Sequence, residues 1–156
     1  MTSMFISNGR NLIKSLNTGQ ILAGLDLGDK TIGIAISDRN LSIGSPIKTI
    51  ARKGGYKDLE SLKNFVNEFK IGGFILGLPL SLNGEENERT KKTRDFGDKL
   101  SSYVELDVYL QDERFSSDVI YKEMKKGSLS NKKINKYINQ SSAAYILQGF
   151  LDKYRY

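Results

Sequence analysis

The stretch ILAGLDLGDKTIGIAIS, residues 21–37, decides the fold of this chain. It holds two apolar runs, Ile21–Leu27 and Thr31–Ser37, which are joined by a short turn at residues 28–30. Two apolar runs of strand length on either side of such a turn predict a β-hairpin. Asp26 interrupts the first run, and a buried carboxylate is costly unless it is paired or binds a metal. The alternative is that Asp26 lies on a solvated face of its strand.

Beyond the hairpin, strand patterns alternate with helix patterns. The predicted strands cover residues 45–50, 74–80 and 104–110, and the predicted helices cover residues 58–70, 88–101, 115–126 and 137–154, with a basic polar loop at 127–136. This order predicts an α/β domain with a central mixed sheet of about five strands, the first three antiparallel, flanked by helices. Residues 1–20 lack clear periodicity, so we expect a loosely structured extension with one helical turn around residues 12–16. Residues 21–156 then form a single domain.

The composition narrows the chemistry open to the chain. None of the 156 residues is Cys or His, which excludes thiol catalysis, disulfides, Ser-His-Asp triads and histidine metal sites. Hard-metal catalysis through carboxylates becomes the leading enzymatic option. A net charge of +6 favours an anionic partner such as nucleic acid, although lysines that only confer solubility would give the same balance. No apolar run approaches the roughly 18 residues of a membrane span, and we expect no export signal and a cytoplasmic protein.

Four motifs follow one another along the chain. They are GLDLG at 24–28 with GIAISD at 33–38, GLPL at 77–80 with Asn83-Gly84, QDER at 111–114, and INQSSAA at 138–144 with ILQGFLD at 146–152. Taken alone, each has a plain structural interpretation: a solvated strand face, a charged helix, an exposed turn and a core helix.

The second and third motifs indicate where a ligand would bind. The loop after Pro79 leads into a helix N-terminus, where backbone N–H groups favour anions and Arg89 is placed to clamp a phosphate. Lys92 and its neighbour Lys91 are better interpreted as part of a solvated helix face. Ligands of open α/β sheets gather beyond the carboxyl ends of strands, where QDER lies. Asp112 and Glu113 point to opposite faces there, so only one of them can join Asp26.

Together and in this order, the motifs resemble the YqgF-type family of bacterial pre-16S rRNA nucleases, also described as Holliday junction resolvases. The resemblance covers roughly residues 22–152. It implies a ribonuclease H-like fold and phosphodiester hydrolysis in the maturation of the 16S rRNA 5′ end and in ribosome biogenesis.

The resemblance also implies the catalytic residues. Asp26 stands where the family has its first-strand aspartate, and Glu113 stands where it has the acid of its Asp-Glu-Arg segment. The third family acid opens the final helix, and that position is Asn139 here, which is a departure from the family pattern. Asp152 is a poor replacement, because thirteen residues at about 100° each put it on roughly the opposite face of the helix. Nearby Asp112 or Asp38 are weaker candidates for help.

By resemblance, the mechanism is two-metal hydrolysis with Mg²⁺ or Mn²⁺. Asp26 would bridge the ions, Glu113 would be a second ligand, and Asn139 would coordinate more weakly through its carbonyl oxygen. The predicted phosphate contacts come from basic residues near these positions: Arg89, Arg114, Lys132, Lys133 and Lys136.

Precursor rRNA is the expected substrate, with a pre-ribosomal particle as a further partner, and the chain is expected to be a monomer or homodimer. Three alternatives remain open. A Holliday junction resolvase acting on branched DNA would need a dimer with two sites. A non-catalytic RNA-binding ribosome-assembly factor would explain Asn139. A small-molecule phosphotransferase fits the first hairpin, but the short chain argues against it.

Overall fold

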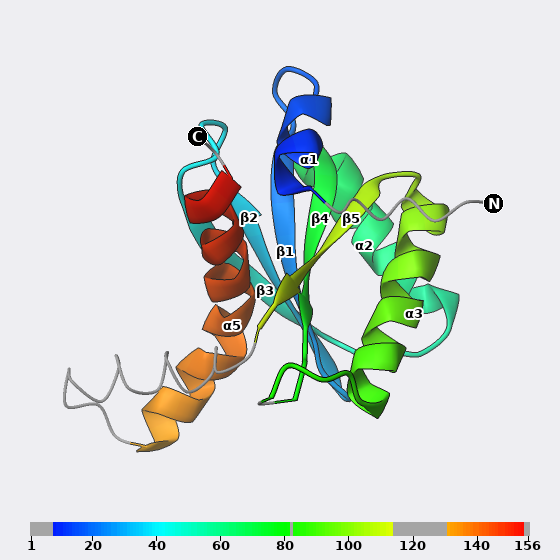
Figure 1. Ribbon diagram of the computed structural model, residues 1–156, viewed down its shortest axis with the longest axis vertical. Helices are drawn as coiled ribbons and strands as arrows, with labels where there is room; N and C mark the ends of the chain where they lie inside the picture. Colours follow the sequence, from blue (N-terminus) through cyan, green and yellow to red (C-terminus); the bar gives the residue numbers. More distant parts are fainter. Residues whose placement is uncertain (1–7, 82, 114–130, 155–156) are drawn as a thin grey trace.

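The computed structural model describes residues 8–81, 83–113 and 131–154, without the side chains of residues 131–140. A five-stranded sheet in the order β3-β2-β1-β4-β5 is flanked by helices (Figure 1). Its strands are β1 (Ile21–Leu27), β2 (Thr31–Ser37), β3 (Gly44–Ala51), β4 (Ile71–Leu78) and β5 (Asp107–Asp112). The helices are α1 (Gly9–Ser15), α2 (Tyr56–Phe69), α3 (Glu88–Val104) and α5 (Asn131–Tyr154).

The sheet is mixed. The first three strands pair antiparallel, whereas β1 pairs with β4 and β4 with β5 in parallel. The hairpin of β1 and β2 begins and ends at the predicted residues, and the N–H of Gly28 donates to the carbonyl oxygen of Thr31 at 2.8 Å to close its turn. The predicted α/β class and the antiparallel first three strands are therefore confirmed.

Alternate residues of the strands supply two cores, one on each face of the sheet. On β1, Ala23 and Leu25 pack on the face covered by α2 and α3, whereas Leu22 packs under α5. Figure 1 shows this arrangement, with α5 on one side of the sheet and α2 and α3 on the other. Because both faces are covered, β4 is almost entirely buried, as its apolar sequence predicted.

Gly24 lets α5 pack directly on β1. A Cβ atom at this position would lie 2.7 Å from the carbonyl oxygen of Ala143 and 2.7 Å from Cβ of Leu147. Contacts this short do not occur, so any side chain here would push the helix away from the sheet. The first glycine of GLDLG thus sets the distance between α5 and the strand that carries Asp26.

Some boundaries differ from those predicted. The segment predicted to be a loose extension with one helical turn around residues 12–16 contains α1, which starts earlier, at Gly9, and Leu12 of this helix is fully buried under α5. The predicted loop at 127–136 is wrong from Asn131 onward, because α5 already begins there. Helix α3 continues through Val104, so β5 starts only at Asp107. The predicted helix at 115–126 lies outside the described residues. Within the described part of the chain, no helix is long and apolar enough to span a membrane.

Candidate active site

Strand alternation places Asp26 on the face of the sheet that α5 covers. Gly24, two residues earlier on β1, faces α5 closely. Side chains two residues apart on a strand share a face, so Asp26 lies on that face as well, next to the carboxyl end of β1. Its side chain is half-buried.

Glu113 reaches the same face from the end of β5. Tyr109 belongs to the core beneath α5, and Glu113 follows it by four residues. Its carboxylate lies over β4, since a Cβ atom on Gly77 would be 2.9 Å from Oε2 of Glu113. The N–H of Glu113 donates to the carbonyl oxygen of Leu78 at 3.2 Å, which extends the pairing of the two strands. Gly77 of the GLPL motif therefore leaves the space that this carboxylate occupies.

The two carboxylates influence each other electrostatically. Burial raises the pKa of Asp26, and the nearby Arg89 guanidinium opposes that shift. Burial, together with the negative charge of Asp26, raises the pKa of Glu113 to about 7, although Arg89 again opposes the shift. Two half-buried carboxylates that repel each other form a site that a cation would stabilise.

Arg89 is brought to this site by the loop after β4. The side chain of Asn87 accepts a hydrogen bond from the N–H of Thr90 at 3.0 Å, and the N–H of Asn87 donates to Oγ1 of Thr90 at 3.1 Å. This capping box starts α3, and the Thr90 hydroxyl also donates to the carbonyl oxygen of Pro79 at 2.9 Å. Arg89 is in the first turn of the helix, so these bonds hold it beside the ends of β1 and β5.

The structure describes less of the other predicted site residues. Arg114 lies outside the described residues. Asn139 and the three predicted phosphate-contacting lysines lie on the first half of α5, where the backbone is described and the side chains are not: Lys132, Lys133 and Lys136. Among the described residues, no group of three or more acids is arranged to hold a metal ion. Asp26 and Glu113 are thus the acids that the described part of the chain brings together here.

Asp38 has a structural role at the opposite end of the sheet from Asp26. Its carboxylate accepts hydrogen bonds from the N–H of Ser42 at 2.7 Å and from the N–H of Ile43 at 3.1 Å. Gln148 of α5 joins this turn, since its Oε1 accepts from the N–H of Gly44 at 2.8 Å. The suggestion that Asp38 could assist the metal site is therefore wrong, because β2 runs antiparallel to β1 and carries Asp38 away.

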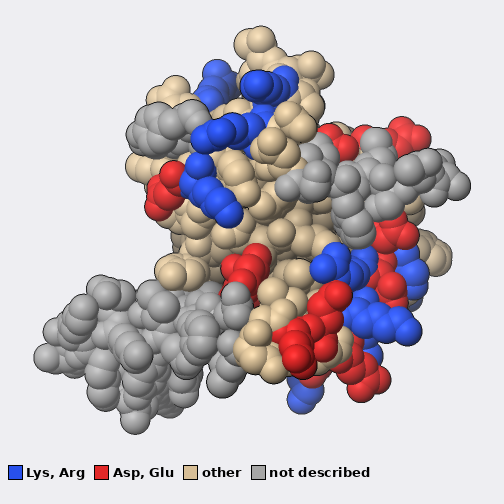
Figure 2. Space-filling model, viewed as in Figure 1, with Lys and Arg blue, Asp and Glu red and all other residues tan. Residues whose placement is uncertain are grey.

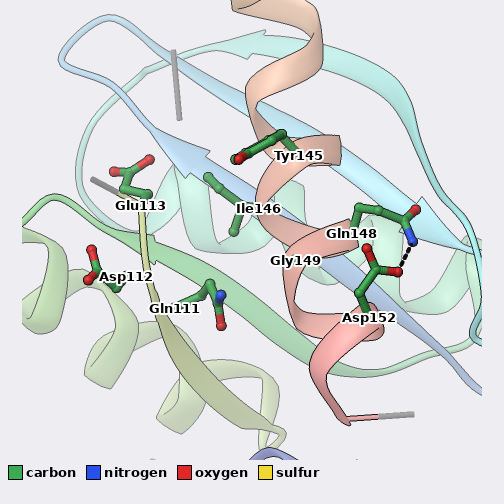
Figure 3. A pocket seen from close by; sticks show the side chains of 8 residues that line it. All are labelled: Gln111, Asp112, Glu113, Tyr145, Ile146, Gln148, Gly149 and Asp152. Atoms are coloured by element: carbon green, nitrogen blue, oxygen red, sulfur yellow. Dashed lines mark hydrogen bonds between the residues drawn. The ribbon is translucent and has the colours of Figure 1, made fainter. Parts of the chain in front are cut away.

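An open pocket of about 270 Å³ adjoins Glu113. Figure 3 shows side chains from β5 on one wall and from α5 on the other, with the Nε2 of Gln148 donating to Asp152 at 2.8 Å. Sequence reasoning missed this pocket and its exposed aromatic residue, Tyr145, which is 41% exposed. A tyrosine beside the apolar face of the last helix was the available signal. The pocket is lined by Gln111, Asp112, Glu113, Tyr145, Ile146, Gln148, Gly149 and Asp152.

Charge is unevenly distributed over the surface that carries the site. Figure 2 shows an acidic patch in the middle of this face. Lys and Arg side chains gather above it, over α1 and the C-terminal end of α5, and others lie beside it over α3. An anionic polymer that approached the acidic patch would therefore meet basic groups above it and a mixture of basic and acidic groups beside it.

Comparison with known proteins agrees with this arrangement. A family model described as RuvX, Holliday junction resolvase, matches residues 20–153. A protein of Ruegeria pomeroyi named "Putative pre-16S rRNA nuclease" is 42% identical over 134 residues, which cover 86% of this chain and 87% of that protein. A protein of the same name from Bartonella quintana is 37% identical over 150 residues, covering 96% of this chain and 94% of its own.

The fold has a counterpart among solved structures. The RuvC of T. thermophilus, solved in complex with a Holliday junction substrate, superposes with a TM-score of 0.52 over 86% of this chain and 96% of that one. Sequence identity is only 13%, so this likeness concerns the fold, which is ribonuclease H-like as expected. The family match over most of the chain, together with relatives at about 40% identity, confirms the YqgF-type resemblance, and the chain belongs to the RuvX family.

Proposed function

We propose that this chain is a Mg²⁺- or Mn²⁺-dependent nuclease that hydrolyses phosphodiester bonds in precursor 16S rRNA. The observation that carries the proposal is the meeting of Asp26 and Glu113 on one face of the sheet, with Arg89 beside both. The names of the Ruegeria pomeroyi and Bartonella quintana relatives support the choice of RNA substrate.

The residues present suit a hard divalent cation. Carboxylate oxygens are the ligands that Mg²⁺ and Mn²⁺ prefer, and the burial of both acids makes their charges costly without a counterion. A metal held there would supply activation of water and stabilisation of negative charge on the attacking and leaving oxygens of the phosphodiester. Asp26 and Glu113 would hold the ions in this role, with Asn139 as a weaker, neutral third ligand.

Arg89 would orient the substrate. A guanidinium can bind two phosphate oxygens at once. The capping box beside it fixes the start of α3, so the chain has already ordered the backbone that carries Arg89 before substrate arrives. Arg114, Lys132, Lys133 and Lys136 would add further phosphate contacts.

Holliday junction resolution is the second candidate function. The description of the matching family and the junction-bound RuvC structure favour it. Resolution requires paired cuts, so it would need a homodimer with two such sites. A pre-ribosomal particle is the expected partner for the first candidate, and a four-way DNA junction is the expected partner for the second.

Replacing Asp26 by Asn tests the proposal. The amide keeps the size of the side chain but removes the charge, so we expect cleavage to be lost while the protein stays folded. The assay follows cleavage of precursor 16S rRNA and of branched DNA, with and without Mg²⁺ or Mn²⁺, and circular dichroism checks the fold.

Asp29→Asn is the matched control, because Asp29 is exposed in the turn that follows the same strand. This variant should cleave at the parent rate. Equal cleavage by the Asp26 and Asp29 variants would overturn the assignment. The substrate that the parent protein cuts decides between the two candidate functions.

A further inference from the structure

A second pocket, of about 410 Å³, lies between α2 and α3 on the opposite face of the sheet from α5. Both charged and aromatic side chains line it: Arg52, Tyr56, Lys92, Asp95, Phe96 and Lys99. None of these residues belongs to the predicted hairpin, to the strand motifs or to the carboxylate pair. We refer to it below as the α2–α3 pocket.

The α2–α3 pocket is connected to the candidate active site along α3. Arg89, in the first turn of this helix, acts electrostatically on both Asp26 and Glu113. Lys92 and Lys99 follow it by three and ten residues, which correspond to about 4.5 Å and about 15 Å along the helix axis. Steps of three and seven residues keep these cations on neighbouring parts of the helix surface. Arg89, at the start of α3, thus lies nearest the carboxylate pair, and Lys92 and Lys99 follow it along the helix to line the pocket.

Arg52 connects the rim of the pocket to the turn that follows β1, the strand that carries Asp26. Its Nη1 donates to the carbonyl oxygen of Gly28, directly after β1, at 2.8 Å. Its Nε donates to Asp58 at 3.1 Å, and the guanidinium carbon lies 5.6 Å from the centre of the Phe96 ring. Arg52 is therefore a fixed wall of the pocket, and its charge is already balanced by Asp58.

The two lysines differ from Arg52 in this respect. Both are exposed, and among the described residues neither forms an ion pair or a cation–π contact. Asp95, on the same wall, offsets part of their charge. The lysines thus keep their charge available for an anionic ligand that enters the pocket.

Tyr56 adds an aromatic surface to these charges. At 64% it is the most exposed of the large hydrophobic residues described, although it begins α2 next to the buried Leu59. An exposed ring beside lysines that follow a groove is the arrangement used to bind single-stranded nucleic acid, in which the cations contact phosphates and the ring stacks on a base.

We propose that the α2–α3 pocket binds a single-stranded segment of the RNA substrate that flanks the scissile phosphate. Lys92 and Lys99 contact successive parts of its backbone, and Tyr56 stacks on one base. The proposal rests on the proposed nuclease function for the identity of the substrate. It assigns Lys92, which the sequence places on a solvated helix face, to substrate binding.

Binding of a single-stranded oligouridylate, measured by fluorescence anisotropy over a series of salt concentrations, tests the pocket. Asp26→Asn protein is used throughout so that the probe is not cut. Lys92→Gln and Lys99→Gln should each weaken binding and reduce the slope of log K against log salt by about 0.7, the value for one phosphate contact on a single strand. Lys91→Gln is the matched control, because Lys91 is also exposed, on the preceding position of α3, but is not among the residues that line the pocket.

Two further variants separate the pocket from general surface charge. Asp95→Asn should tighten binding, since Asp95 is the one acid among the described residues that line the pocket, whereas Asp98→Asn, three residues further on and outside it, should have less effect. Tyr56→Ala should weaken binding about fivefold or more, and Tyr56→Phe should restore it, because stacking needs the ring and not the hydroxyl.

The outcomes separate this proposal from the proposed function. Equal affinities and salt slopes for the Lys91 and Lys92 variants, or no binding of the oligouridylate by Asp26→Asn protein with an unchanged pocket, would overturn the pocket assignment whatever the cleavage assay shows. Cleavage that survives Asp26→Asn would overturn the proposed nuclease site, but a specific loss of binding in the Lys92 and Tyr56 variants would still support the pocket.

Discussion

At the residue scale, Glu113 shows most clearly that the candidate site destabilises the folded protein. Its side chain is half-buried, close to the negative charge of Asp26, and these two effects raise its pKa from 4.5 to about 7. A protein gains nothing in stability from such a pair of acids. A raised pKa of this kind is typical of residues that serve binding or catalysis rather than folding.

This raised pKa predicts how the stability of the metal-free protein depends on pH. The folded protein keeps the Glu113 proton up to about pH 7, whereas the unfolded chain releases it near 4.5. Raising the pH between these values therefore favours the unfolded chain, and stability falls by on the order of 3 kcal/mol from this group. Glu113→Gln removes the titration, so urea unfolding of this variant should lack that part of the decrease.

Added Mg²⁺ provides the second arm of the same measurement. A cation bound to both carboxylates favours their charged forms, so it should stabilise the parent at about pH 8 and have much less effect on Glu113→Gln. If the two proteins show the same pH dependence with and without Mg²⁺, Glu113 is not in the environment described here.

Residues differ in how far sequence could identify them. Asp26 could be predicted because a single acid inside an apolar strand has few structural explanations. Alternation lets only one acid of QDER share a face with Asp26, and it was the resemblance to the family that selected Glu113. The meeting of Tyr56 and Lys92 in one pocket could not be predicted, since it depends on how α2 packs beside α3, which no local pattern records.

At the scale of elements, the glycine contacts decide where α5 lies. Gly24→Ala would place a methyl group 2.7 Å from the backbone of α5, which cannot move without losing its contacts with β2 and β3. We expect a loss of about 1–3 kcal/mol in the free energy of unfolding. Thermal and urea unfolding measure this loss directly.

Gly149→Ala is the control for this prediction, since it lies on α5 itself. A Cβ atom there would have as its nearest neighbour Nε2 of Gln111 at 3.5 Å, an ordinary contact. Because alanine favours a helix over glycine by about 1 kcal/mol, this variant should be as stable as the parent or more stable. A Gly24→Ala protein that is equally stable would show that α5 does not press on β1.

Elements with a strong local pattern were predicted well, and the others were not. The first two strands have the predicted bounds because two apolar runs and a tight turn leave one consistent pairing. The start of α5 was missed because Lys132, Lys133 and Lys136 gave its first turns the composition of a loop. The burial of Leu12 was not predicted, because α1 is short and is held by tertiary contacts with α5 rather than by its own periodicity.

At the scale of the whole molecule, acidic and basic surface groups lie close to one another. The chain carries a net charge of +6, yet an acidic patch lies in the middle of the face in Figure 2. A polyanion attracted by the basic surroundings is repelled at the carboxylates themselves. A bound divalent cation would remove that repulsion, and the number of acids around it decides how firmly it is held.

Position 139 is where the resemblance to the family implies a third acid, and this chain has Asn139 there. It lies one helical turn before Ala143, the residue whose backbone contacts Gly24, and α5 runs towards the carboxyl end of β1 in that direction. Helix geometry therefore puts position 139 on the same side of α5 as Ala143 and towards the end of β1 that carries Asp26. This supports the assignment of Asn139 as the third position of the site.

Asn139→Asp should consequently complete the site. An amide offers only a dipole, whereas a carboxylate adds a full negative charge towards holding two dications that repel each other. We expect metal binding tighter by about tenfold or more and faster single-turnover cleavage of precursor rRNA.

Gln140→Glu is the matched control, because it adds the same charge one residue along, about 100° around the helix. If calorimetric titration finds the same metal affinity for Asn139→Asp as for the parent, the third ligand is elsewhere. Equal gains in the two variants would mean that negative charge anywhere near this end of α5 suffices, and that Asn139 has no direct contact with the metal.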